Sequence, residues 1–166
     1  MKKGQMFTVD FILGLVGFTF LLLLAIKIFI SIVPMGAYPD LYRNNIYISD
    51  QLVNEGFPEN WNETMVIIPG LTDDYKLNLT KIIAHDAINY NHTKTLYHTS
   101  TEYIFFFRNN TDVINISSCL HGYPLAYNTT TCEPDLSSMS YTDLVTTTRL
   151  VAYNSSLLQL IVYSWY

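Results

Sequence analysis

The first 33 residues constrain this chain most, because an almost unbroken apolar run from Phe11 to Val33 follows a short polar segment. Lys27 is the only charged residue in the run. As an α-helix the run would extend about 34 Å, which is enough to cross a bilayer. Asp10 immediately precedes it, and a carboxylate placed in hydrocarbon costs about 2.5–3.5 kcal/mol unless it has a partner. The sequence therefore predicts a membrane helix with an acid near its start that must be neutralised.

The lysines predict how this helix is oriented. Lys2 and Lys3 precede it, which places the N-terminus in the cytoplasm and the rest of the chain outside. Lys27 lies close enough to the outer end for its ammonium group to reach the head groups. The alternative is a secretory signal peptide cut near Ser31-Ile-Val-Pro-Met-Gly-Ala37, although the apolar run is longer than such a signal needs.

The rest of the chain is acidic. Without Lys2, Lys3, Lys27 and Asp10, the nine basic and fourteen acidic residues become six and thirteen. Phosphate binding needs clustered Lys and Arg, so no nucleic-acid partner is expected. The roughly 130 residues after the apolar run suffice for one globular domain with a single modest core.

Asn-X-Ser/Thr sequons are frequent in this outer part, as in glycosylated extracellular domains. A chain rich in Asn and Thr also produces sequons by chance, so polar loop composition is the alternative. No cofactor and no metal are expected. N-linked glycans are predicted at Asn62, Asn78, Asn91, Asn109, Asn115, Asn128 and Asn154.

The two cysteines, Cys119 and Cys132, predict a disulfide across a loop. Closing a loop of this length would stabilise the fold by about 3 kcal/mol in the chain-entropy model. A metal site is the alternative, but it would need further ligands, and His121 is the candidate that lies nearby.

A second helix is predicted after a break at Pro34–Pro39, where the prolines lack amide donors. Asp40 is the expected N-cap and Gly56 the expected C′ residue of this helix. Helical spacing predicts that it lays one apolar face on a sheet, through Leu41, Ile48 and Leu52.

Strands are predicted beyond Gly56 from β-branched and aromatic runs at Thr64–Pro69, Glu102–Phe107 and Asp112–Ser117. A short helix is expected over Asn89–Tyr97. Trp61 is expected to be buried where the second helix meets the sheet.

The clearest predicted element is a terminal hairpin of Leu144–Tyr153 and Ser156–Tyr166 with a turn at Asn154-Ser155. Its last strand is apolar on both faces and is predicted to be covered on both. The expected buried sets are Leu158, Leu160 and Val162 on one face and Leu157, Ile161 and Trp165 on the other.

Enzymatic chemistry is not expected. His85 and Asp86 are adjacent and point in different directions, and no motif for a nucleophile, metal or haem occurs. Surface positions are predicted for the four histidines. The thirteen tyrosines suit half-exposed strand faces, with surface adhesion as the alternative.

The segment Lys2-Lys-Gly-Gln-Met-Phe-Thr-Val-Asp-Phe11, placed ahead of a long apolar helix, resembles the class III signal peptide of archaeal type IV pilin-like proteins. In that family a prepilin peptidase cuts after the glycine on the cytoplasmic side. The resemblance implies a cut between Gly4 and Gln5, which leaves the helix attached. Many members have a glutamate at the position of Val9, whereas the acid of this chain follows one residue later, at Asp10.

Parts of the outer domain also resemble pilin-like proteins of the methanogen type. The similar segments are Glu55–Asn62, Val66–Leu71, Lys76–Ile82 and the Arg149–Ser156 hairpin. The resemblance is weakest between His85 and Thr101 and in the cysteine loop.

The freed amine of Gln5, or Lys27 of a staggered neighbour, would pair with Asp10 in an assembly. Lys27 of the same chain lies about 25 Å away along a helix and cannot reach it. The alternative is that Asp10 lies in the wet interfacial layer and needs no partner.

The expected fold is therefore α+β: a long N-terminal apolar helix plus a mainly antiparallel β-sheet head, the pilin-like lollipop. The expected organisation is a leader (residues 1–4), an apolar helix (5–33), a break (34–39) and an extracellular head (40–166). The expected function is a structural subunit of an archaeal type IV pilus-like surface filament. Its partners would be copies of itself, the prepilin peptidase, the pilus assembly machinery and, before assembly, the membrane. The alternatives are a minor pilin or membrane-held pseudopilin, or an uncleaved, membrane-anchored adhesin-like glycoprotein.

Overall fold

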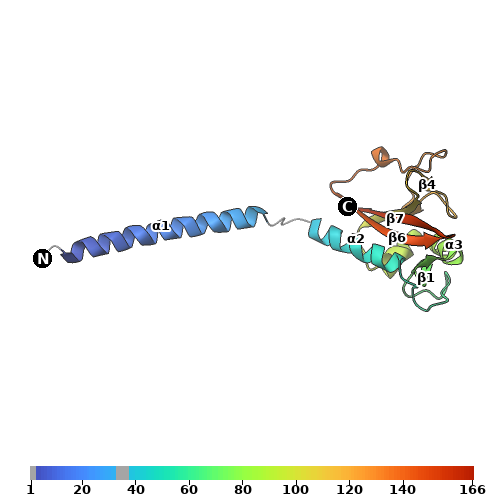
Figure 1. Cartoon of the computed structure of the whole chain (residues 1–166), viewed down its shortest axis with the longest axis horizontal. Coiled ribbons are helices and arrows are strands. Elements are labelled where there is room, and N and C mark those ends of the chain that lie inside the picture. Colours follow the sequence, from blue (N-terminus) through green and yellow to red (C-terminus); the bar gives the residue numbers. More distant parts are fainter. Residues whose placement is uncertain (1–2, 33–37) are drawn as a thin grey trace. The chain divides into compact units, whose positions relative to one another are not determined.

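The computed structural model describes residues 3–32 and 38–166, with side chains for residues 11–28 and 39–166. The chain divides into two compact units, Met1–Tyr38 and Pro39–Tyr166. Figure 1 traces the elements of both units in sequence order. Most of the predicted break at Pro34–Pro39, together with Val33, lies outside the described residues.

The first unit contains one helix, α1 (Lys3–Ile32). Its Phe11–Ile28 stretch is long and apolar enough to cross a membrane, a test that a signal sequence also passes. Every described side chain of this stretch is exposed, and apolar residues occupy all sides of the helix. The hydroxyl of Thr19 donates a hydrogen bond of 2.7 Å to the Leu15 carbonyl oxygen, so this polar group is satisfied within the helix. The predicted apolar helix is present, and its described side chains from Phe11 to Ile28 form a continuous apolar surface of the kind that needs an apolar covering.

Helix α2 (Tyr38–Leu52) opens the second unit. It begins two residues before the predicted N-cap Asp40, which instead lies in the first turn, where a negative charge favours the helix dipole. Leu41, Ile48 and Leu52 are fully buried, as predicted.

The predicted C′ role of Gly56 is wrong, because α2 ends at Leu52. Gly56 has φ +79°, and a Cβ there would lie 2.6 Å from the Ile68 carbonyl oxygen. A glycine is required at this position by a close approach of two loop segments.

Within the described residues, seven strands form one curled sheet in the order β1-β2-β6-β7-β3-β4, with β5 also paired to β3. The strand bounds are β1 Thr72–Asp73, β2 Lys76–Leu77, β3 Glu102–Arg108, β4 Val113–Ile114, β5 His121–Gly122, β6 Leu144–Tyr153 and β7 Ser156–Trp165. The pairings are antiparallel except that β2 runs parallel to β6. The sheet is therefore mixed, and the predicted antiparallel character holds for its central strands.

The central strands β3 and β7 are buried on both faces. One face carries Phe105, Phe107 and Leu160, and it belongs to the main core with residues of α2 and α3. The other face carries Phe106 and Ile161, which pack with the two cysteines. The predicted two-sided burial of the last strand is confirmed except at Leu157. That residue is exposed at the hairpin end, where it pairs with Ala152.

Two short helices pack on the sheet. Helix α3 (Leu79–Ala87) was not predicted, and Asn78 caps it by accepting hydrogen bonds from the amides of Thr80 and Lys81. Helix α4 (Tyr90–Leu96) confirms the short helix predicted over Asn89–Tyr97. A single turn of 3₁₀-helix, η1, spans Leu136–Ser138.

The strand predicted over Thr64–Pro69 is not formed, because the segment contributes only an isolated bridge between Phe57 and Ile68. Trp61 beside it is buried as predicted, but against Ala84 of α3 and Ile88, which follows α3, rather than at a junction of α2 and sheet. Its indole nitrogen donates a hydrogen bond of 2.9 Å to the Gly70 carbonyl oxygen, which joins the two ends of the 61–70 loop.

Candidate functional site

The residues predicted for processing and assembly all lie in α1. Gly4, Gln5 and Asp10 belong to its first turns, and their side chains lie outside the described part of the structure. Lys27 is exposed near the other end of the described apolar surface. Seventeen positions of helix separate Lys27 from Asp10, or about 25 Å, so one chain does not bring the two charges together.

The predicted glycosylation asparagines occupy loops, caps and one helix of the second unit. Five are exposed (Asn91, Asn109, Asn115, Asn128 and Asn154), whereas Asn62 and Asn78 are half-buried. Asn154 lies at the hairpin turn with φ +46°, a conformation that asparagine tolerates better than most residues.

The Asn78 and Asn91 sequons each contain a side chain that is hydrogen-bonded to another part of the folded domain. The Asn78 side chain caps α3 and donates to Asp73 Oδ2 at 2.6 Å. The hydroxyl of Thr93, which belongs to the Asn91 sequon, is buried and accepts a hydrogen bond from the Tyr103 hydroxyl at 2.6 Å. Transfer of a glycan to either asparagine would have to precede the formation of these contacts.

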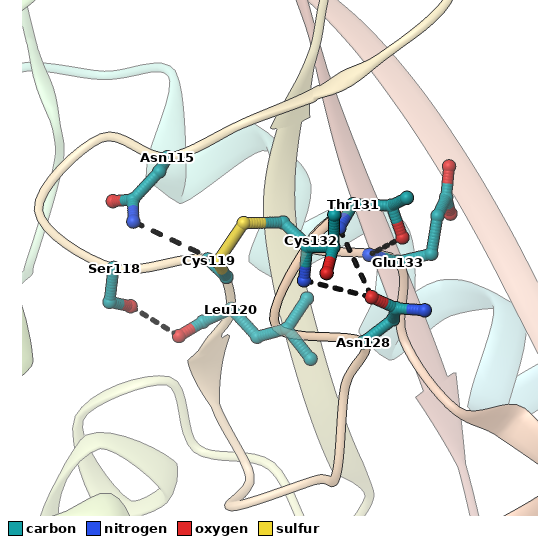
Figure 2. Close-up of a disulfide and its surroundings, with 9 residues drawn as sticks. Asn115, Ser118, Cys119, Leu120, Asn128, Thr131, Cys132 and Glu133 are labelled. Carbon is teal, nitrogen blue, oxygen red and sulfur yellow. Dashed lines mark hydrogen bonds between the residues drawn. A yellow bond between two sulfur atoms is a disulfide. The ribbon is translucent and has the colours of Figure 1, made fainter.

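The structure contains the predicted disulfide between Cys119 and Cys132, with 5.1 Å between the two Cα atoms (Figure 2). Both cysteines are buried against Phe106 and Ile161. The disulfide therefore anchors the cysteine loop on the face of the sheet opposite α2. Among the described residues, no group of three or more His, Cys, Asp or Glu is placed to hold a metal ion.

A polar cluster that was not predicted joins α3 to residues on both sides of Cys119. Asp86 on α3 lies 2.6 Å, through Oδ1, from His121 Nδ1. Its other oxygen, Oδ2, accepts a hydrogen bond of 3.0 Å from the Ser117 hydroxyl. The hydroxyl thus binds the carboxylate rather than an imidazole, so these residues do not form an activated nucleophile.

His85 and His121 are buried, which corrects the prediction of surface positions for these two histidines; His92 and His98 are exposed as predicted. The imidazole of His121 stacks on Phe105, with ring centres 4.7 Å apart, and His85 meets the edge of the same ring at 5.1 Å. Burial lowers the pKa of His85 from 6.5 to about 4, helped by the nearby His121 and opposed by Asp86.

A cavity of about 300 Å³ borders this cluster. Its walls come from the end of α3, the start of α4 and the β5 segment, with Tyr90, Thr93 and Leu120 lining it beside the two histidines. The cluster was missed because α3 was missed: a helix there places His85 three residues after the buried Ile82, on the same inward face.

No family model, curated protein or solved structure matches this chain.

Proposed function

We propose that this chain is a structural subunit of an archaeal type IV pilus-like surface filament. In this proposal the precursor is inserted in the membrane with its N-terminus in the cytoplasm, and a prepilin peptidase cuts between Gly4 and Gln5. The helix then moves from lipid into the apolar core of a filament made of copies of the chain, and the Pro39–Tyr166 domain lies outside. Its role is structural rather than catalytic.

The observation that carries the proposal is the apolar surface of α1. All described residues from Phe11 to Ile28 are exposed, with apolar side chains on every side. Such a helix is stable only when lipid or other apolar helices surround it. A filament core satisfies this need on all sides, and a bilayer satisfies it before assembly.

The charges of α1 favour assembly over a permanent anchor. Asp10 lies about 25 Å along the helix from Lys27, and a carboxylate is costly in hydrocarbon. A neighbouring helix offset along the filament axis would offer Asp10 an opposite charge. The resemblance of residues 2–11 to a class III signal peptide supports the same conclusion.

The second candidate is an uncleaved, membrane-anchored ectodomain with an adhesin-like role. The separate, disulfide-containing unit Pro39–Tyr166 suits either function. The two differ at Asp10, because a lone anchor gains nothing from that carboxylate.

Replacing the carboxylate tests the proposal. Asp10→Ala should insert into the membrane at least as well as the native chain, since a buried charge is removed, while the yield of surface filaments falls at least several-fold. Filament yield is measured by shearing the cells and comparing the amount of this chain in the sheared fraction with the amount in the membrane fraction. Asp40→Ala, which removes an exposed acid that pairs with Arg43 at 3.0 Å, is the matched control and should assemble normally. Normal filament yield from Asp10→Ala would contradict charge pairing in assembly.

A further inference from the structure

The Ser117–Gly122 segment, which contains Cys119, is held to α3 through the carboxylate of Asp86. Asp86 accepts hydrogen bonds from both Ser117 and His121, which lie at the two ends of a short segment that contains Cys119. Strand β5 within this segment pairs with β3 at only two positions, Ile104↔Gly122 and Phe105↔His121. By contrast, β7 pairs along the whole of β3. Apart from the disulfide at Cys119, the Ser117–Gly122 segment is therefore paired with β3 over fewer positions than the central strands are with one another.

His85 lies directly behind this attachment. On the same helix, Asp86 Oδ1 is 4.0 Å from His85 Nδ1, which is beyond hydrogen-bonding distance. The ammonium group of Lys81, also on α3, instead binds the carboxylate of Asp73 and the carbonyl oxygens of Glu55 and Thr72. His121 faces it from β5, with Tyr97 from the end of α4. Phe105 on β3 supplies the remaining ring contact.

Within the described part of the chain, neither ring nitrogen of His85 has a hydrogen-bond partner. A proton added to His85 would therefore place a positive charge in a closed aromatic site, next to another histidine and without a direct acceptor. The one nearby carboxylate already accepts two hydrogen bonds.

We propose that His85, Asp86 and His121 form an acid-sensitive latch, which releases the Ser117–Gly122 segment from α3 in mild acid while the β6–β7 hairpin stays folded. Release opens the cavity between α3, α4 and β5 and exposes the region around the disulfide. The inference does not depend on filament assembly, because every residue in it belongs to the Pro39–Tyr166 unit.

The direction of the effect follows from proton linkage. In the closed state the pKa of His85 is about 4, because the ring is buried. In the released state the ring is in water, with an ordinary pKa near 6.5. Between these values the released state binds a proton that the closed state does not. The release equilibrium therefore increases by up to about tenfold for each unit that the pH falls from 6 toward 4.5.

Amide hydrogen exchange tests the latch on the full chain in detergent micelles, measured by mass spectrometry from pH 7.5 to 4.5 and corrected for intrinsic exchange rates. Amides of residues 117–122 should lose protection as the pH falls, by up to about tenfold per unit below pH 6, while amides of β6 and β7 keep theirs. Loss of protection in both regions together, or in neither, would contradict the proposal.

Two variants separate the latch from general acid sensitivity. His85→Phe keeps a ring beside Phe105 but cannot bind a proton, so residues 117–122 should stay protected at pH 4.5; acid release equal to that of the native chain would overturn the proposal. His92→Phe, at an exposed position on α4, is the matched control and should show the native acid response.

Should His85→Phe not fold, Asp86→Asn provides the second test. That variant should already exchange faster at residues 117–122 at pH 7.5, and native protection there would refute the role of Asp86.

Discussion

At the scale of single residues, a few buried polar side chains fix the helices of the second unit to its sheet. Asn45 on α2 is fully buried, and its amide nitrogen lies 2.9 Å from Ser164 Oγ and 3.2 Å from the Val162 carbonyl oxygen. Lys81 on α3 is also buried, and its ammonium bonds to the carboxylate of Asp73 and to the carbonyl oxygens of Glu55 and Thr72. Each side chain thereby connects its helix to residues that are distant in the sequence.

Asn45→Ala should therefore lower the free energy of unfolding by about 1–3 kcal/mol, because it removes hydrogen bonds and leaves a small void between α2 and the sheet. Urea unfolding in detergent micelles measures this, with the fluorescence of the buried Trp61 and Trp165 as the signal. Asn44→Ala is the matched control, since its half-buried side chain should contribute much less. Equal stability of the two variants would show that Asn45 does not fix α2.

Residue-scale burial was only partly predictable from the sequence. Leu41, Ile48 and Leu52 follow a clear helical stripe, and their burial was predicted correctly. His85 and His121 were placed at the surface because histidine is commonly half-exposed and because α3 was not recognised. Asp86, which binds His121, lies 35 positions from it in the sequence, so only the tertiary fold brings the cluster together.

At the scale of elements, local turn chemistry decides which hairpins can be recognised. The β6–β7 turn has φ +46° at Asn154 and +63° at Ser155, the pattern of a type I′ turn, and asparagine signals it. The β1–β2 turn has the same pattern at Asp74 and Tyr75, with φ +47° and +61°. Tyrosine does not indicate such a turn, and each flanking strand has only two residues, so this hairpin was missed.

Ser155→Gly should stabilise the second unit by about 1 kcal/mol, because glycine adopts positive φ without the steric cost that serine bears. The variant keeps the Asn154-X-Ser156 sequon, so the pattern for glycosylation is unchanged. Thermal unfolding followed by circular dichroism should give a higher midpoint than for the native chain. Ser155→Val should shift the midpoint downward; a shift in the same direction for both variants would contradict the turn assignment.

The failed strand prediction over Thr64–Pro69 has a similar local cause. Val66, Ile67 and Ile68 have the β-branched composition of a strand, but Asn62 accepts hydrogen bonds from the amides of Thr64 and Met65 and thereby forms a turn. Only Ile68 then reaches a bridge, with Phe57. Composition indicated the strand, and a side-chain cap prevented it.

At the scale of the whole molecule, two units with different surfaces explain how the chain is suited to its proposed role. The Phe11–Ile28 part of α1 exposes apolar side chains on all sides, whereas Pro39–Tyr166 has its own core and a disulfide. The apolar helix was predictable because its signal is compositional and needs no tertiary partner. The mixed sheet was not, because the parallel pairing of β2 with β6 joins segments that are far apart in the sequence.

The central claim is that the chain is cut between Gly4 and Gln5 and assembles through α1. The most direct test is mass spectrometry of sheared, purified surface filaments, which identifies both their main component and its N-terminal residue. The claim predicts that this chain is a principal component and begins at Gln5. A chain that retains Met1 and stays in the membrane fraction, absent from the filaments, would contradict it.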